Sequence, residues 1–209
     1  MIIQQTRLKY INKSIGYGVF AKTLIPKGTI IRVEDSLDKI YTPAQVSQMN
    51  LQLQDIIDEY SYRNKDGNYL LCWDNGRMMN HSFRANCFLT PYHFEIATED
   101  ILPGQELTND YGVFNVEEPM YGTIEGTRRR NVYPDDLLKY HKIWDEKIRK
   151  AFFKINEVEQ PLSFLIDIET QRQIQMIINK VEPMKSVLEM YCPFINQRFY
   201  QKSQLKNGL

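Results

Sequence analysis

Cysteine is scarce in this chain of 209 residues, which has only Cys72, Cys87 and Cys192. Their number is odd, and their spacing matches no metal-ligand pattern. Small secreted scaffolds depend on many paired cysteines, whereas a reducing compartment leaves thiols free. The cysteine content therefore argues against a disulfide scaffold and favours a reducing compartment.

Long apolar runs are also missing. The first residues, Met1 to Arg7, contain no apolar core long enough for a signal peptide. No uninterrupted apolar stretch elsewhere approaches the length of a membrane span. We therefore expect no secretion by a recognisable signal peptide and no membrane partner, and we expect the protein in the cytoplasm or the nucleus.

The chain has no excess charge of either sign, since 26 basic side chains balance 26 acidic ones. Global charge therefore selects neither nucleic acid nor an anionic membrane as a partner. The arginine run 128–130 has no accompanying aromatic stacking pattern, so we interpret it as a solvated loop rather than a nucleic-acid contact. Local acids could suit a basic peptide, and these are Asp55, Asp58, Glu59, Glu117 and Glu118.

The first half of the chain alternates short apolar or β-branched runs with turn residues, which predicts strands. Pro26 and Gly28 illustrate such a turn, because proline fixes one φ angle and glycine permits a positive one. The strands are expected at residues 8–11, 19–21, 29–33, 69–73, 87–90, 92–98 and 106–111. This pattern favours a mostly β fold.

A helix is predicted to interrupt the strands from Thr42 onward. Thr42 can cap it, Pro43 suits the first helical position, and Gln45 completes a capping box. Lys65 to Asn68 ends it. Its apolar residues recur at helical spacing and predict one buried face, made of Val46, Met49, Leu53, Ile56, Ile57 and Tyr60.

The pattern changes after Pro119. Residues 122–133 are polar and predict a connector, and Pro134 opens a region of helices that Pro161 and Pro183 interrupt. The tail from Gln201 is polar and expected to fray. The first helical stripe comprises Leu137, His141, Trp144, Ile148, Phe152 and Ile155; later stripes comprise Ile174, Ile177, Ile178 and Val181, then Met184, Val187, Leu188 and Tyr191.

Two short motifs suggest a ligand site. Gly16-Tyr17-Gly18 is a tight turn on the simplest interpretation, but its glycines would also let the backbone approach a ligand closely. Asn80-His81 follows an apolar pair of methionines and is either a polar turn with a structural histidine or a binding site. The amide of Asn80 offers both donors and acceptors, which suits a ligand with an adenine edge and an amino-acid headgroup.

Together with Glu106 to Gly112, these motifs resemble, in their order, the SET domain of one class of protein lysine methyltransferases. The resemblance implies a knot-like crossing in which the last segment threads under a loop and brings Asn80-His81 beside Tyr111. It further implies a SET domain over residues 1–118 with a helical insert at about 42–64. A connector at 119–134 and a C-terminal helical region at 135–209 would follow.

The resemblance also implies the cofactor, S-adenosyl-L-methionine, and residue roles. Tyr111 would be catalytic, and the substrate channel would involve Tyr17, Tyr60 and Asn109, although Tyr60 also fits the buried face of the helix. At the position of Asn109 the family is often aromatic, and this position affects how many methyl groups are added. The implied cofactor-binding residues are Gly16, Tyr17, Gly18, Asn80, His81, Tyr111 and Phe114, with plain packing an equal alternative for Phe114.

The chain departs from the family at two places. Phe83 and Ala85 stand where the family commonly has cysteine and proline, and residues 120–130 contain no cysteine. The histidines His81, His93 and His141 share no ligand spacing. We therefore expect no metal.

The sequence thus predicts an enzyme that methylates a lysine side chain of a protein or peptide, with a histone among the candidate substrates. One alternative is an inactive SET-fold binding or scaffolding module that acts through its C-terminal helices. Another is a structural or oligomerisation protein dominated by those helices. We expect their apolar stripes to pack against the SET core, with closure of the site or a homo-oligomer interface as the other options.

Overall fold

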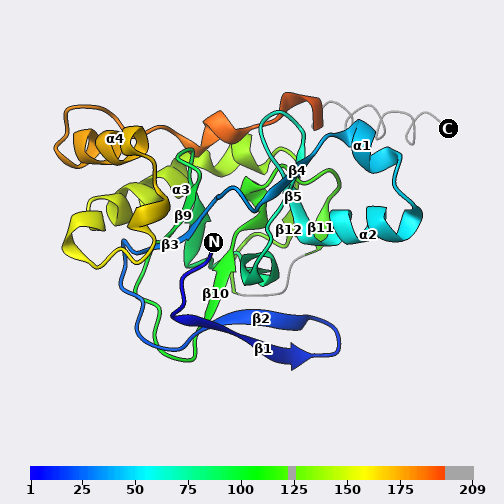
Figure 1. Ribbon diagram of the computed structural model, residues 1–209, viewed down its shortest axis with the longest axis horizontal. Helices are drawn as coiled ribbons and strands as arrows, with labels where there is room; N and C mark the ends of the chain where they lie inside the picture. The colour runs from blue at the N-terminus through cyan, green and yellow to red at the C-terminus, as the bar shows by residue number, and fades with distance from the viewer. Residues whose placement is uncertain (122–125, 196–209) are drawn as a thin grey trace.

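The computed structural model describes residues 1–121 and 126–195 (Figure 1). Part of the predicted connector, at 122–125, and the tail predicted to fray from Gln201 lie outside the described residues. Among the described residues, no helix has both the length and the apolar character needed to cross a membrane.

The core of the molecule is a seven-stranded sheet, which confirms the mostly β first half. Its order is β1-β2-β10-β8-β9-β3, and β7 also pairs with β10. The pairs of β10 with β7 and β8 are parallel, and the others are antiparallel. The strands are β1 Thr6–Asn12, β2 Gly16–Ala21, β3 Ile30–Val33, β7 Asn80–His81, β8 Cys87–Leu89, β9 Phe94–Ala97 and β10 Glu106–Asn109.

The turn at Pro26-Lys27-Gly28 forms where the sequence predicts it. Gly28 has a φ of +95°, a conformation that glycine adopts without the penalty of a side chain. A Cβ atom there would also lie 2.6 Å from the Cβ of Lys154, so the turn packs tightly under the C-terminal region. After it, β3 buries Ile30 and Ile31 fully in the core.

A small second sheet, β4-β6-β5, carries the insert. Thr42 and Gln45 form the predicted capping box. The prediction of a single helix is wrong, however. The helix ends at residue 47, and a second helix begins at residue 51, capped by the side chain of Asn50. The elements are β4 Lys39–Tyr41, α1 Pro43–Ser47, α2 Leu51–Tyr60, β5 Ser61–Arg63 and β6 Tyr69–Leu71.

The predicted buried face of this insert is also largely wrong. Val46 and Ile57 are buried, but Leu53 is 46% and Ile56 is 47% exposed. The physical reason is that α2 packs against β5 and β6 of the small three-stranded sheet and projects away from the main core (Figure 1). Tyr60 is half-buried rather than core.

The first C-terminal stripe is confirmed by the long helix α3, Asp136–Phe152. Its buried side chains join the same hydrophobic core as the strands, and Phe152 stacks on Phe94 at 6.0 Å between ring centroids. Ile155 lies beyond the helix in a 3-10 turn, η3. The other strands and the other helix of this half are β11 Met120–Tyr121, β12 Asn131–Val132 and α4 Ile168–Ile178. The 3-10 turns come from both halves of the chain. They are η1 Asn75–Met78, η2 Tyr111–Val113, η3 Ile155–Glu157, η4 Ser163–Leu165 and η5 Val187–Met190.

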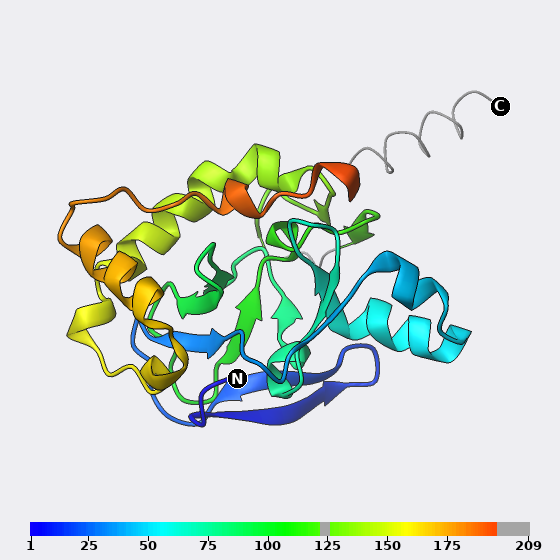
Figure 2. The same cartoon turned by 45° about the horizontal axis from the view of Figure 1, so that its top comes forward.

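The last described segment runs back along α3 (Figures 1 and 2). Asp145 of α3 accepts hydrogen bonds from Ser186 Oγ at 2.6 Å and Val187 N at 2.8 Å. The third predicted helix is the 3-10 turn η5. The later C-terminal stripes reach the hydrophobic core through Ile174, Ile177 and Val187, whereas Val181 is 62% exposed. The boundaries at 118 and 134 stay predictions.

Candidate functional site

Tyr111 begins η2 one residue after the end of β10, with Asp110 as the cap between them, and it meets the Asn80-His81 strand directly. Its hydroxyl donates a hydrogen bond to the Met79 carbonyl at 2.8 Å, and its N–H donates to His81 Nδ1 at 3.1 Å. The parallel pairing of β7 with β10 sets this register, because Asn109 lies opposite His81. The two motifs predicted to form one site are therefore adjacent.

The loop between β7 and β8 is fixed to β10 by Asn86, which is 7% exposed. Asn86 Nδ2 donates to the Glu106 carbonyl, and its Oδ1 accepts from Thr108 N, both at 2.9 Å. The N–H of Ser82 donates to the Asn109 carbonyl at 2.9 Å. A side-chain amide that satisfies two backbone groups in this way keeps the loop rigid beside Tyr111.

An arginine that the sequence predicted to be solvated binds Asp110, the residue before Tyr111. Arg129 forms ion pairs with Asp110 and Asp136, and its guanidinium lies over the ring of Tyr140 at 4.4 Å. Its side chain is only 15% exposed, whereas Arg128 and Arg130 are exposed as expected. Nothing in three adjacent arginines indicates which one turns inward.

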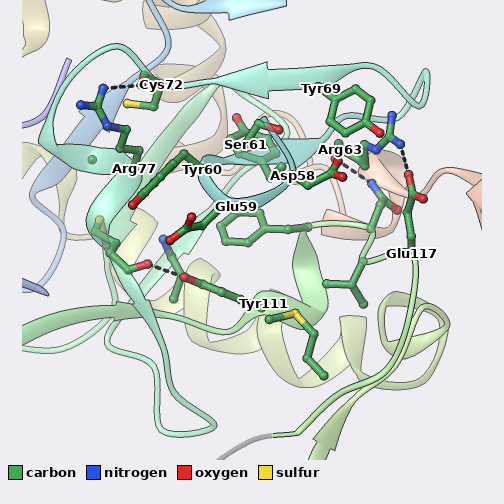
Figure 3. Close-up of a pocket in the computed structure, with 18 of the residues that line it drawn as sticks. Asp58, Glu59, Tyr60, Ser61, Arg63, Tyr69, Cys72, Arg77, Tyr111 and Glu117 are labelled. Atoms are coloured by element: carbon green, nitrogen blue, oxygen red, sulfur yellow. Dashed lines mark hydrogen bonds and ion pairs between the residues drawn. The ribbon is translucent and has the colours of Figure 1, made fainter. Parts of the chain in front are cut away.

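A cavity of about 520 Å³ opens between the insert and the segment after Tyr111 (Figure 3). It brings together four of the predicted residues, Tyr60, Asn109, Tyr111 and Phe114. Residues that the sequence interpretation did not single out complete its lining, among them Arg32, Arg63, Tyr69, Cys72, Arg77, Met79, Glu95 and Asn115.

Aromatic rings form one wall of this cavity. Tyr62 packs on Phe114 with ring centroids 4.9 Å apart, and Phe114 packs on Tyr111 at 5.7 Å. The hydroxyl of Tyr62 donates to Glu34 Oε1 at 2.5 Å, and burial raises its pKa well above the ordinary value. Phe114 therefore couples the insert to the residue expected to be catalytic.

Tyr111 is a neutral phenol in this environment. Burial raises its pKa to about 12, and the charges of Glu95 and Glu106 act in the same direction. Since its proton is donated to the Met79 carbonyl, the lone pairs of the phenol oxygen remain for another donor. The group can orient a ligand by accepting a hydrogen bond.

The closed end of the cavity contains a buried polar network. Arg32 Nη1 donates to Glu95 Oε1 at 3.3 Å, and Asn109 Nδ2 donates to Glu95 Oε2 at 2.7 Å. Burial raises the pKa of Glu95, while Arg32 and Asn109 oppose that shift. A lone glutamate within a strand and an arginine 63 positions away in sequence give no signal that predicts this contact.

The remaining predicted residues gather around Asn80, outside the cavity lining. Asn80 Nδ2 donates to the Tyr17 carbonyl at 3.1 Å and to Glu106 Oε1 at 2.7 Å. A Cβ on Gly18 would lie 2.4 Å from Glu106 Oε1 and 2.9 Å from Asn80 Nδ2, so a larger residue there would displace these hydrogen-bonded side chains. Gly16, with a φ of +81°, faces open space, and Tyr17 is 50% exposed. Together with His81, these residues are not among the described residues that line the cavity.

Phe83 occupies the position where the resembling family often has cysteine. Its ring lies edge-on to His81 at 4.5 Å between centroids, and the Arg129 guanidinium lies 4.7 Å from its centre. Within residues 1–121 and 126–195, no group of three or more histidine, cysteine or acidic side chains could hold a metal ion. Aromatic packing and the Arg129 ion pairs hold this corner of the described structure together.

The family model described as SET domain matches residues 16–112, a little under half of the chain. The match begins at Gly16 and ends at Gly112, so it includes all three motifs. No curated protein matches the chain.

Two solved structures are among those similar to the chain. A candidate histone methyltransferase from Plasmodium falciparum is 19% identical over 53% of this chain and 95% of its own, with a TM-score of 0.40. The methyltransferase domain of the human histone-lysine N-methyltransferase SETMAR is 20% identical over 51% of this chain and 44% of its own, with a TM-score of 0.38.

Proposed function

We propose that the protein transfers a methyl group from S-adenosylmethionine to a lysine side chain of a protein, with a histone as one candidate. The observation that carries this proposal is the position of Tyr111. Its phenol touches the backbone just before Asn80, and its ring lines the cavity. One residue thus contacts both the predicted cofactor residues and a space into which a side chain could enter.

The residues around Asn80 fit the cofactor. Gly16 leaves open space above its backbone, and His81 and Phe114 are half-buried flat rings suited to the adenine. Asn80 uses both hydrogens of its amide internally, so its carbonyl oxygen is the group left for a ligand. An acceptor there suits the ammonium of the cofactor's amino-acid end.

The cofactor, when bound, supplies a methyl group on a sulfonium, and transfer to an amine is an in-line displacement. Alignment therefore contributes most of the catalysis. The attacking amine must be neutral, although a free lysine has a pKa of about 10.4. A desolvated cavity disfavours its ammonium form, as does a neighbouring positive charge.

Tyr111 is suited to align the amine rather than to deprotonate it. Its raised pKa keeps the phenol protonated at neutral pH, and its hydrogen already points to Met79. The phenol oxygen can accept an N–H of the amine and direct the nitrogen lone pair toward the methyl group. Water in the open half of the cavity can then carry the released proton away.

The charge of the cavity fits a basic peptide around the target lysine. Its lining contains five carboxylates, from Asp58, Glu59, Glu95, Glu117 and Glu118, and three guanidinium groups, from Arg32, Arg63 and Arg77. Four of the five acids that the sequence suggested for peptide binding lie here, and Asp55 does not. A net negative lining attracts cationic segments and raises their rate of encounter.

The crossing expected of the family is part of the same proposal. We propose that the chain beyond β10 passes beneath the 82–86 loop, which places Tyr111 beside Asn80. The contacts of Asn86 and Ser82 with β10 support this arrangement.

A methyl-transfer assay with Tyr111→Phe tests the function. Core histones serve as acceptors and methyl-labelled S-adenosylmethionine as donor. We expect the parent to transfer label and the variant to lose at least about a hundredfold in kcat, as is typical when an aligning group is removed. Calorimetry should show the same cofactor affinity for both proteins within about threefold.

Tyr92→Phe is the matched control, because the Tyr92 hydroxyl also has a backbone partner, Lys185 N at 2.7 Å, but lies outside the cavity lining. Full activity of Tyr111→Phe would refute the assigned role. A parent that binds no S-adenosylmethionine would instead support the inactive binding module.

A further inference from the structure

Residues 1–33 carry charge of one sign only. They contain no acidic residue, whereas the whole chain balances 26 acidic against 26 basic side chains. Arg32 is buried, but Arg7, Lys9, Lys13 and Lys22 are exposed. The neutral total therefore conceals a cationic surface on and beside the hairpin of β1 and β2.

Strand β1 is a free edge of the main sheet. It stands first in the strand order, and β2 is its partner among the described strands. Both views show it at the rim of the molecule (Figures 1 and 2). Its antiparallel register with β2 runs without a shift from Thr6 to Tyr10. An edge strand presents a row of N–H and C=O groups with which another strand can pair.

The two faces of β1 differ in chemistry. Successive side chains of a strand point to opposite faces, so Arg7 and Lys9 share one face. Leu8 and Tyr10 share the other, where they are 36% and 54% exposed. Lys9 lies over the Phe20 ring of β2, 5.1 Å from its centre. Neither Arg7 nor Lys9 forms an ion pair with any residue in 1–121 or 126–195. The edge is therefore basic on one face and apolar on the other.

The acid on the basic face of this sheet is Glu106, and it is already engaged. It lies on β10, opposite Phe20, and its Oε1 accepts from Asn80 Nδ2 at 2.7 Å. Because β2 separates β10 from β1, the carboxylate is about two strand spacings, or about 10 Å, from the edge. The positive charge of β1 is thus left for a group outside the chain.

The geometry points to β1 as a docking edge for an extended segment of another protein in which acidic and apolar residues alternate. Residues directly opposite each other on paired strands share a face. Acidic side chains of the segment would lie beside Arg7 and Lys9, and apolar ones would lie beside Leu8 and Tyr10. Main-chain hydrogen bonds then provide affinity, and the alternation provides specificity. This surface is independent of the proposed methyl transfer.

Other occupants use less of this edge. In any antiparallel register, two β1 strands from two copies would set basic side chains either against basic ones or against Leu8 and Tyr10. Like charges directly opposite each other are destabilising. A nucleic acid would contact the basic face, but it has no peptide backbone to pair with the strand. A protective edge would need the charges alone and leaves the exposed apolar face without a role.

A synthetic peptide of alternating glutamate and valine is the probe, with a fluorophore at one end. The control peptide has the same composition arranged as one glutamate block and one valine block. Because both carry the same charge, general electrostatic attraction would bind them equally. Fluorescence anisotropy should show that the alternating peptide binds at least about tenfold more tightly, as a few matched cross-strand pairs would produce. The backbone amide resonances of β1 should shift with this peptide.

Two N-methylated forms of the probe test the main-chain pairing. Alternate N–H groups of a strand point to the same side, so methylation at every glutamate or at every valine blocks one side of the peptide only. One form should bind at least about tenfold more weakly than the other. Equal binding of the two forms would overturn the proposal, as would equal binding of the alternating and block peptides.

Charge reversal tests the assigned residues. The double variant Arg7→Glu with Lys9→Glu should lose the glutamate–valine peptide and gain an alternating lysine–valine peptide, an exchange that a merely structural role would not produce. Arg128→Glu with Lys142→Glu is the matched control, because it makes the same charge change at exposed residues elsewhere and should leave binding within about twofold of the parent.

Circular dichroism checks that each variant folds, and if one does not, the peptide measurements on the parent decide. A folded reversal variant that keeps the parent's preference would overturn the proposal. A thymidine oligonucleotide that binds more tightly than the probe and displaces it would overturn it in favour of nucleic acid. A protein that binds the probe but transfers no methyl group would refute the proposed function and leave this inference standing, and the opposite result would do the reverse.

Discussion

Replacing Arg129 by methionine should destabilise the protein strongly. The guanidinium of Arg129 lies between Asp110 and Asp136, each 1% exposed, and it joins the Tyr111 segment to the start of α3. Methionine keeps much of the side-chain volume over Tyr140 but removes the charge. Two buried carboxylates would then lose their shared cation.

The magnitude follows from the burial of that triad. Removing one partner of a buried ion pair typically costs about 3–5 kcal/mol, because the remaining charge stays desolvated. Asp136 already has its pKa raised by burial, and loss of Arg129 raises it further. Lowering the pH protonates the carboxyls, so the difference between parent and variant should shrink as the pH falls from 7 toward 4.

Urea unfolding at pH 7 and pH 4.5 measures this difference. Arg149→Met is the matched control, because Arg149 pairs with Glu146 on the surface of α3, with side chains 50% and 45% exposed. Surface pairs contribute little, so the control should lose less than about 1 kcal/mol at either pH. A loss below about 1 kcal/mol for Arg129→Met at pH 7 would refute the role given to this triad.

Three further outcomes are expected. Asn115, at a φ of 51°, donates to the carbonyls of Arg63 and Met190 and accepts from Cys192 N. Urea unfolding should show Asn115→Ala to be less stable than Asn115→Gly by about 1 kcal/mol, because alanine is strained at this φ; equal stability would contradict this. Gly112→Ala should destabilise the protein by about 1–3 kcal/mol in thermal unfolding, since its Cβ would lie 2.9 Å from the Trp144 ring of α3. An unchanged unfolding midpoint would contradict this tight packing between Gly112 and α3. Methyl transfer should rise with pH from 7 to 10 as the substrate amine deprotonates, with no loss from ionisation of Tyr111, whose pKa is raised to about 12; a decline starting below pH 9 in a folded enzyme would contradict the neutral phenol.

Local chemistry made much of the fold predictable. β-Branched runs separated by proline and glycine turns indicated the strands, and the Thr42 capping box indicated the start of α1. The break before α2 escaped prediction because apolar spacing continued across it. Asn50, a good capping residue, was the available signal, since its side chain accepts from Leu53 N.

In the candidate site, too, the contacts made by sequence motifs were predictable, and those set by tertiary packing were not. The order of three motifs was enough to expect Tyr111 beside Asn80 and His81, and in the structure Tyr111 is hydrogen-bonded to His81 and to Met79, the residue before Asn80. Arg129 and Glu95 were not predicted, because their partners are set by tertiary packing. Spacing within one element cannot show which member of a charged run turns inward, or which strand residue faces a distant arginine.

The most direct test of the central claim is a crystal structure of the protein with S-adenosylhomocysteine and a lysine peptide. We predict that the homocysteine sulfur and the lysine nitrogen approach Tyr111 from opposite sides, with the nitrogen about 3 Å from the phenol oxygen. A cofactor bound away from Gly16 to Gly18 and Asn80, or a lysine outside the cavity, would contradict the account.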